Sequence, residues 1–207
     1  MVAVTVIGPG SIGSAVVAVA VRGGADVQVL GRTEAKARAA AEPLGASFGA
    51  VGDTLTGDIV VLAVPFDAVE EILGQYHAAF RGRVLVDVSN PVDFATFDGL
   101  IVPAYSSAAQ AMQSTVPEAR VLKAFNTNFA ATLHSGVIAD QPTAVLVAGD
   151  DADAKEALLG VVRTAGLRGV DAGSLKRARE LEAIGFLQLT LGMREEISWT
   201  GGLGLVA

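Results

Sequence analysis

The sequence lacks cysteine altogether and contains only two histidines and a single tryptophan. The absence of cysteine excludes disulfide bonds and thiolate metal sites. The two histidines, His77 and His134, lie far apart in the sequence and do not form a metal-binding motif such as His-Glu-x-x-His. No apolar run reaches the roughly 18 residues that a membrane-spanning helix needs. We therefore expect no metal site and no insertion into a membrane.

Basic residues are also scarce in this chain. Against 22 Asp and Glu there are 15 Lys and Arg, so the formal net charge is -7 and the isoelectric point lies near 4.8. Nucleic-acid binding needs clustered basic surface, and this balance argues against it. An anionic small ligand would therefore need a local positive site. The opening residues, MVAVTVIG, show neither the basic segment nor the cleavage site of a secretory signal, so we expect a cytoplasmic protein.

The chain alternates between segments typical of buried strands and segments typical of helices. With 207 residues, 51% of them hydrophobic, it can bury one substantial core. Strands are predicted at 2–7, 25–32, 46–50, 58–65, 83–91, 119–126, 143–149 and 167–173. Helices are predicted at 11–22, 33–42 and 129–135, and from residues 66, 151 and 175 onward. This alternation predicts an α/β fold with a doubly wound, mainly parallel sheet.

No linker interrupts this pattern. We expect a single domain over 1–207, with a core of about 1–139 and a short α/β extension of about 140–207 that continues and caps the sheet.

A glycine-rich loop follows the first predicted strand and precedes the first predicted helix. Its sequence, IGPGSIG, has the G-x-G-x-x-G spacing. In that context the first glycine permits a tight turn, the second lets the backbone approach a pyrophosphate, and the third allows close packing of helix and strand. We expect a Rossmann-type nucleotide site. The loop residues assigned to it are Gly8, Pro9, Gly10, Ser11, Ile12 and Gly13.

The end of the second strand indicates which dinucleotide binds. An acidic residue is expected there when the ribose 2′-hydroxyl is free, but the chain reads GRTEAK from Gly31. Arg32 carries a permanent charge suited to phosphate, and the hydroxyl of Thr33 can cap the following helix on the side of the same anion. Lys36, one turn later, points back toward Arg32. These residues favour NADP over NAD.

Other strand ends carry residues suited to positioning a ring. Val64 and Pro65 can offer a flat apolar wall, although Pro65 also suits simple strand termination. Asn90, followed by Pro91, and Asn126 can orient a carboxamide or carbonyl, although turn formation or capping would equally explain both asparagines. We assign Val64, Pro65, Asn90 and Pro91 to the cofactor site and treat Asn90 and Asn126 as orienting residues.

No convincing acid–base pair accompanies these strand ends. His134 reads as a helix-end histidine, His77 as a surface histidine, and Trp199 as a packing residue, with ring stacking as the alternative for Trp199. Hydride transfer between stacked rings needs positioning more than an acid or a base, so no catalytic side chain is assigned.

The last predicted helix contains the run IGFLQLTLGM, from Ile184 to Met193, which is apolar around much of its circumference. We expect a homodimer through this region, with a buried core helix as the alternative.

Several motifs, taken in order, resemble the NADP oxidoreductases that use the deazaflavin coenzyme F420. They are IGPGSIG, GRTEAK, DVSNP, SSAAQAM, PEARVLKAFNT from Pro117, and ARELEAIG. The resemblance spans most of the chain, and it implies hydride exchange between NADPH and a deazaflavin stacked on the nicotinamide. It also places Arg32 and Lys36 where that family binds the 2′-phosphate.

The glycine loop departs from the polar GGTGNQG of the archetypal deazaflavin enzymes at Pro9, Ser11 and Ile12. Relatives with similar loops reduce flavins, ferric iron or other acceptors, so these acceptors stay open as alternatives. A non-enzymatic NADP(H) sensor is another alternative. An imine or dehydroproline reductase is disfavoured, because those enzymes add a long helical dimerisation domain and only about two helices are available here.

Overall fold

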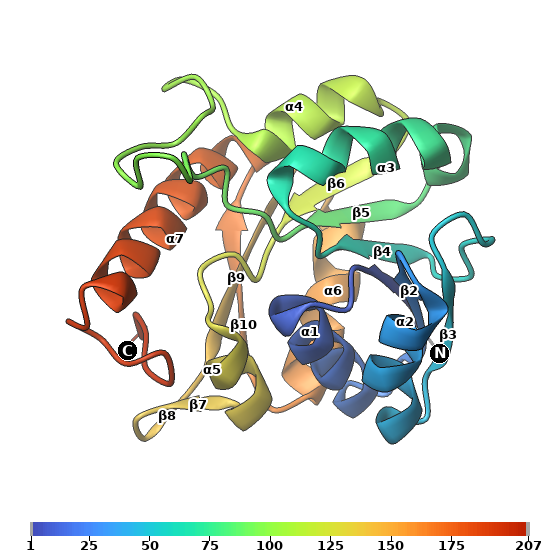
Figure 1. Cartoon of the computed structure of the whole chain (residues 1–207), viewed down its shortest axis with the longest axis horizontal. Helices are drawn as coiled ribbons and strands as arrows, with labels where there is room; N and C mark the ends of the chain where they lie inside the picture. Colours follow the sequence, from blue (N-terminus) through green and yellow to red (C-terminus); the bar gives the residue numbers. More distant parts are fainter. Residues whose placement is uncertain (1, 206–207) are drawn as a thin grey trace.

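The computed structural model describes residues 2–205 and contains one eight-stranded sheet between two layers of helices (Figure 1). The strand order is β10-β9-β6-β5-β4-β1-β2-β3. The strands are β1 Ala3–Ile7, β2 Asp26–Gly31, β3 Ser47–Ala50, β4 Ile59–Leu62, β5 Val84–Asp87, β6 Arg120–Lys123, β9 Ala144–Gly149 and β10 Arg168–Gly173. The short hairpin of β7 (Val137–Ile138) and β8 (Gln141–Pro142) lies outside this sheet. The order β3-β2-β1-β4-β5-β6 is that of a Rossmann fold, so the predicted fold class is confirmed.

Helices connect these strands. They are α1 Ser11–Arg22, α2 Glu34–Ala41, α3 Val69–Tyr76, α4 Ala108–Thr115, α5 Ala130–Ser135, α6 Ala152–Thr164 and α7 Ala178–Met193. Single 3-10 turns occur at Glu42–Leu44, Phe66–Ala68, His77–Phe80 and Leu175–Arg177.

Two apolar clusters cover the two faces of the sheet. Val4 and Val6 of β1 pack in the cluster that includes α1 and α6, whereas Ile7 packs in the cluster that includes α3 and α4. This division follows from the alternation of side chains along a strand, and burial on both faces explains the continuous apolar strand sequences.

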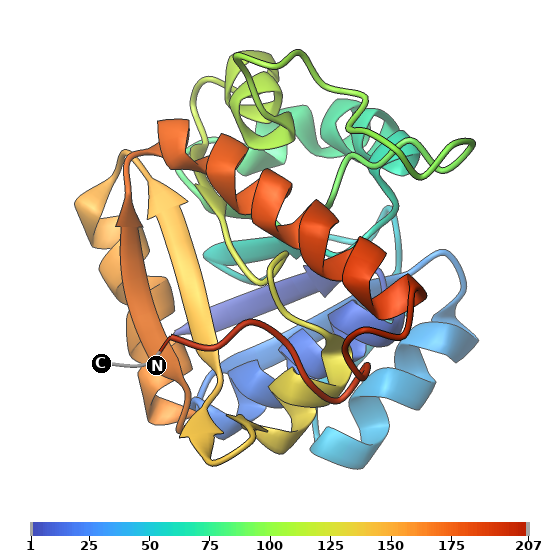
Figure 2. The ribbon, with the colours of Figure 1, turned by 90° about the vertical axis from the view of Figure 1, so that its left-hand side faces the viewer.

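The direction of β9 differs from that of its neighbour β6. All pairs from β3 to β6 are parallel, but β6 and β9 are antiparallel, and β9 and β10 are again parallel to each other. The chain passes from β6 to β9 through the short α5 and the β7–β8 hairpin. After α6 and β10, α7 runs diagonally in front of the strands as seen in Figure 2. The C-terminal segment therefore continues the sheet, as expected, while the reversal of its strands was not foreseen.

Candidate functional site

The glycine loop lies between the carboxyl end of β1 and the first turn of α1. Gly8 has a φ of +104°, which suits glycine, and its N–H donates to the carbonyl of Leu30 at 2.8 Å. A side chain at Gly13 would collide with the carbonyl of Gly8 and would lie 3.1 Å from Cβ of Ala63. A Cβ at Gly10, by contrast, would meet no protein atom within 4 Å. The loop is therefore closed toward the sheet and open at Gly10.

The first turn of α1 has no side-chain cap. Gly10 is the N-cap residue, and it has no side chain with which to accept a hydrogen bond from the first N–H groups. These N–H groups, together with the positive end of the helix dipole, make a fitting anion site beside the open face of Gly10.

The end of β2 presents its polar residues to solvent. Gly31 is buried, whereas Arg32, Thr33 and Lys36 are exposed. Within residues 2–205, neither Arg32 nor Lys36 forms an ion pair with a carboxylate. Thr33 occupies the N-cap position of α2 as expected, but its hydroxyl makes no capping hydrogen bond, so this part of the prediction was wrong. All three polar groups are consequently available to a phosphate.

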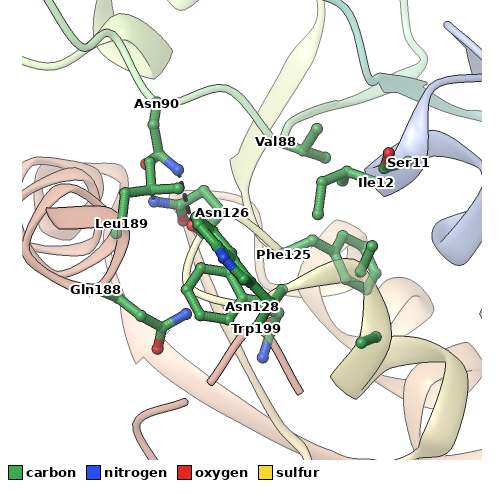
Figure 3. A pocket seen from close by; sticks show the side chains of 14 residues that line it. Ser11, Ile12, Val88, Asn90, Phe125, Asn126, Asn128, Gln188, Leu189 and Trp199 are labelled. Carbon is green, nitrogen blue, oxygen red and sulfur yellow. Dashed lines mark hydrogen bonds between the residues drawn. The ribbon is translucent and has the colours of Figure 1, made fainter. Parts of the chain in front are cut away.

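A cavity of about 450 Å³ opens beside the glycine loop (Figure 3). Its wall combines the start of α1, the segments after β5 and β6, and α7 with the segment that follows it. The lining residues are Ser11, Ile12, Val88, Asn90, Phe125, Asn126, Asn128, Phe129, Ala130, Ala131, Gly185, Gln188, Leu189 and Trp199. Because this lining carries no charged side chain, the cavity suits a neutral, largely apolar group.

Asn90 and Asn126 meet at one wall of this cavity through reciprocal hydrogen bonds. The amide of Asn90 donates to the carbonyl of Asn126 at 2.9 Å, and the amide of Asn126 donates to Oδ1 of Asn90 at 2.9 Å and to the carbonyl of Leu181 at 2.8 Å. A side chain at Gly185 would press on both asparagines, so α7 can approach them only because this residue is glycine. The two strand-end amides thus lie together, in contact with α7.

Two carbonyl oxygens at this wall have no protein partner. Oδ1 of Asn126 and Oδ1 of Asn128 are buried without a hydrogen bond, while the amide of Asn128 donates to the carbonyl of Ala144 at 2.9 Å. Buried polar atoms are usually paired, so the unmet hydrogen-bonding capacity of this wall is of the acceptor type.

The other assigned residues lie apart from the cavity lining. Val64 is half-buried next to Gly8, where a Cβ on the glycine would lie 3.0 Å from Cγ1 of Val64. Pro65 is exposed beyond the carboxyl end of β4, and Pro91 is buried. Val64 and Pro65 therefore border the glycine loop, while Pro91 supports the turn after Asn90.

The histidines lie away from this region. Nε2 of His77 is 3.2 Å from the carbonyl of Thr115 on the surface, and His134 is exposed at the end of α5, where its carbonyl accepts from Arg22. Neither lines the cavity.

A buried ionic cluster at the carboxyl ends of β5 and β6 was missed by sequence reasoning. Nζ of Lys123 lies 2.6 Å from Oδ2 of Asp87, 2.6 Å from the carbonyl of Ser89 and 2.9 Å from Oε1 of Glu182, and all three charged side chains are 0% exposed. The N–H of Ala108, at the start of α4, donates to both carboxylate oxygens of Glu182 at 3.0 and 3.1 Å. The cluster joins β5, β6, α4 and α7.

The charges of this cluster do not cancel, because two carboxylates share one ammonium group. Burial raises the pKa of Glu182 above its ordinary value, and the nearby Asp87 adds to the rise, while Lys123 opposes it. The signal available in the sequence was an aspartate and a lysine inside otherwise apolar strands, VLVDV and RVLKAF. The third charged residue, Glu182, lies in α7, and no local sequence pattern indicated its role.

Two further features concern the described part of the chain. Among residues 2–205, the helices are too short or too polar to span a bilayer. Within the same range, acidic and histidine side chains nowhere gather in a group of three that could hold a metal ion.

Comparison with known proteins gives the relationships of the chain. Residues 3–91 match the family model described as NADP oxidoreductase, coenzyme F420-dependent. The F420-dependent NADP reductase of Methanocaldococcus jannaschii is 28% identical over 151 residues, which cover 70% of this chain and 66% of that protein. The metalloreductase STEAP3 of Rattus norvegicus is 38% identical over 103 residues, 50% of this chain but only 20% of that protein.

A solved structure extends the likeness to the whole fold. A proposed F420-dependent NADP reductase from Arthrobacter sp. FB24 superposes with a TM-score of 0.83 over 99% of both chains, at 24% identity. At this identity the likeness concerns the fold, including the C-terminal segment. Residues 3–91, the segment that carries β1 to β5, are thus the part of the chain that is similar to the coenzyme F420-dependent NADP oxidoreductase family.

Proposed function

We propose that the protein is an oxidoreductase that transfers a hydride between NADP(H) and a planar deazaflavin, coenzyme F420. One observation carries the proposal: Ser11 and Ile12 of the glycine loop also line the neutral cavity. A dinucleotide held at the loop would therefore bring its nicotinamide to the cavity where a second ring fits. The F420-dependent NADP reductases among the relatives support the choice of ring.

Each part of the nucleotide has suitable partners in the chain. The uncapped start of α1 and the open side of Gly10 would hold the pyrophosphate. Arg32, Thr33 and Lys36 would hold the 2′-phosphate. Val64 and Pro65 would contact the ribose beside the loop, and Asn90 and Asn126 would shape the wall against which the rings lie.

The chemistry needs little from the side chains beyond position. The nicotinamide supplies the hydride when bound, and the chain supplies orientation and a cavity that excludes water. The reciprocal bonds of Asn90 and Asn126, held by the carbonyl of Leu181, keep one wall rigid. No catalytic acid or base is part of this proposal.

Two alternatives have specific support or specific tests. A metal acceptor, such as a ferric chelate, has its support in the match to the rat metalloreductase, which covers half of this chain. A non-enzymatic NADP(H) sensor would bind the nucleotide at the same loop but would not transfer its hydride to an acceptor.

We further propose a cytoplasmic protein whose residues 1–207 act as one domain, with residues 140–207 completing the acceptor site.

Direct hydride transfer is the expected result when NADPH deuterated at nicotinamide C4 is mixed with coenzyme F420. The label should arrive in reduced F420, because the two rings would be in contact and no exchangeable side chain would relay the hydride. Mass spectrometry of the product measures it, with each of the two C4 deuterated epimers tested. FMN, FAD and a ferric chelate serve as parallel acceptors. Oxidation of NADPH by none of the four would favour the sensor alternative.

We also propose that the protein forms a homodimer through the outer face of α7. The inner face of this helix carries small and polar residues such as Gly185 and Gln188, whereas Leu187 and Met193 on the outer face are each 53% exposed. Loop 92–105 lies on the same side of the molecule and exposes Phe94, Ile101 and Tyr105 (Figure 2). Exposed apolar residues gathered on one side of a molecule are typical of an interface, and a second copy of the same chain is the simplest partner for such a face.

A charged residue in this face should separate the two copies. Leu187→Asp is expected to convert a dimer, at micromolar concentration, into a monomer of 21.0 kDa, because it would bury a carboxylate between apolar faces. Sedimentation velocity measures the change. Leu44→Asp, at an exposed leucine on the 3-10 turn after α2, is the matched control and should stay dimeric. A monomeric wild-type protein would rule the dimer out.

A further inference from the structure

The chain beyond α7 returns across the cavity and places Trp199 in its wall. The indole ring lies 4.8 Å from the ring of Phe129, measured between centroids. It also covers Gly192 of α7, where an added Cβ would lie 3.3 Å from two of its ring atoms. One side of the indole is thus packed on the protein, while the side chain as a whole stays 50% exposed at the cavity (Figure 3).

This returning segment is anchored at several points. Gln188 is 2% exposed; its amide donates to the carbonyl of Thr127 at 3.1 Å, and its Oε1 accepts from the N–H of Leu203 at 2.9 Å. Farther on, Arg168 donates to the carbonyl of Leu205 at 2.9 Å. The indole is therefore held at the cavity by contacts before and after it in the chain.

We propose that Trp199 is an acceptor-binding residue on which a flat, uncharged, conjugated ring stacks. This inference rests on the proposed function and adds the residue that selects the class of acceptor. The other aromatic residues of the lining, Phe125 and Phe129, are 2% and 6% exposed and have little surface left to offer. Trp199 alone among the lining aromatics keeps a large open surface, and stacking on such a surface binds any ring with a π-face.

The charge of the cavity supports the same class of ligand. Its lining residues are apolar, amide or hydroxyl residues, so an anionic chelate would find no counter-charge there. Trp199 and the uncharged lining together select a neutral aromatic ring over a ferric chelate.

The test measures binding of the ring by itself, in protein saturated with NADP⁺ so that no turnover occurs. Riboflavin and coenzyme F420 are the probes, and their own fluorescence gives the dissociation constant. Trp199→Leu should raise that constant about tenfold for both probes, because the stacking surface is lost. Trp199→Phe, which keeps an aromatic ring, should stay within about threefold of the wild type. Leu44→Ala, at a leucine that is 37% exposed and lies outside both the cavity lining and the proposed dimer face, is the control and should bind as the wild type does.

The outcomes separate this inference from the proposed function. Unchanged NADP⁺ affinity in Trp199→Leu shows that the variant is folded. Equal binding of both probes by the wild type and by Trp199→Leu overturns the role of Trp199 while the hydride-transfer proposal stands. Binding that depends on Trp199 but leads to no hydride transfer upholds the site and rejects the reaction. A wild-type protein that binds neither probe overturns both.

Discussion

Replacing Lys123 with methionine is expected to lower the free energy of unfolding by about 3–5 kcal/mol at neutral pH. Lys123 is the cation of a fully buried cluster, and its loss leaves Asp87 and Glu182 without a counter-charge in a site that is 0% exposed. Methionine nearly preserves the volume and the apolar stem of lysine, so the change in stability reports the loss of the charge. Urea denaturation followed by circular dichroism measures it. A loss below about 1 kcal/mol would contradict the prediction.

Glu182→Gln is the matched control, and its effect on the free energy of unfolding should be opposite to that of Lys123→Met. Glutamine keeps an oxygen for the N–H of Ala108 and for Lys123, but it removes the carboxylate that exceeds the single ammonium group. Because the folded protein raises the pKa of Glu182, wild-type stability from this group is present at low pH and is lost as the pH rises through the raised pKa. The stability of Glu182→Gln relative to wild type should therefore increase as the pH rises above the ordinary range of a carboxyl group.

Replacing Arg32 and Lys36 together with alanine is expected to weaken NADPH binding about a hundredfold or more. Each charge-assisted hydrogen bond to the 2′-phosphate should contribute on the order of 1.5–3 kcal/mol. Both cations are exposed, Arg32 just after β2 and Lys36 in the first turn of α2. NADH lacks that phosphate, so its affinity should stay nearly the same. Isothermal titration with each nucleotide measures the difference.

A control for this pair lies on the same helix. Arg38 is occupied by Glu34 at 3.6 Å and stacks over Phe48 at 4.9 Å, so it is not available to a phosphate. Arg38→Ala should therefore leave both affinities close to those of the wild type. An equal loss of NADPH and NADH affinity in the Arg32 and Lys36 variant would show that these residues do not read the 2′-phosphate.

Sequence patterns predicted those features of the fold and the site that depend on residues close together in the chain. The continuous apolar strands and the glycine loop indicated a Rossmann fold, because burial on both faces and a turn at Gly8 leave local marks. The same reading placed Arg32 at the end of the second strand and Lys36 in the first turn of the next helix, and the structure has both residues exposed there. Even the C-terminal strands were found from their composition, and the continuation of the sheet was expected.

Other features depend on which distant segments meet, and only the tertiary structure decided them. The reversed direction of β9 depends on the path of the connection at residues 124–143, which no local pattern encodes. Asp87, Lys123 and Glu182 read separately as ordinary charges, and they form one buried cluster only because α7 docks on β5 and β6. Trp199 likewise reaches the cavity because Gly192 lets its ring approach α7. Hydrophobic period and turn chemistry act over a few residues, whereas burial of charge and shape of a cavity are set by contacts between segments far apart in sequence.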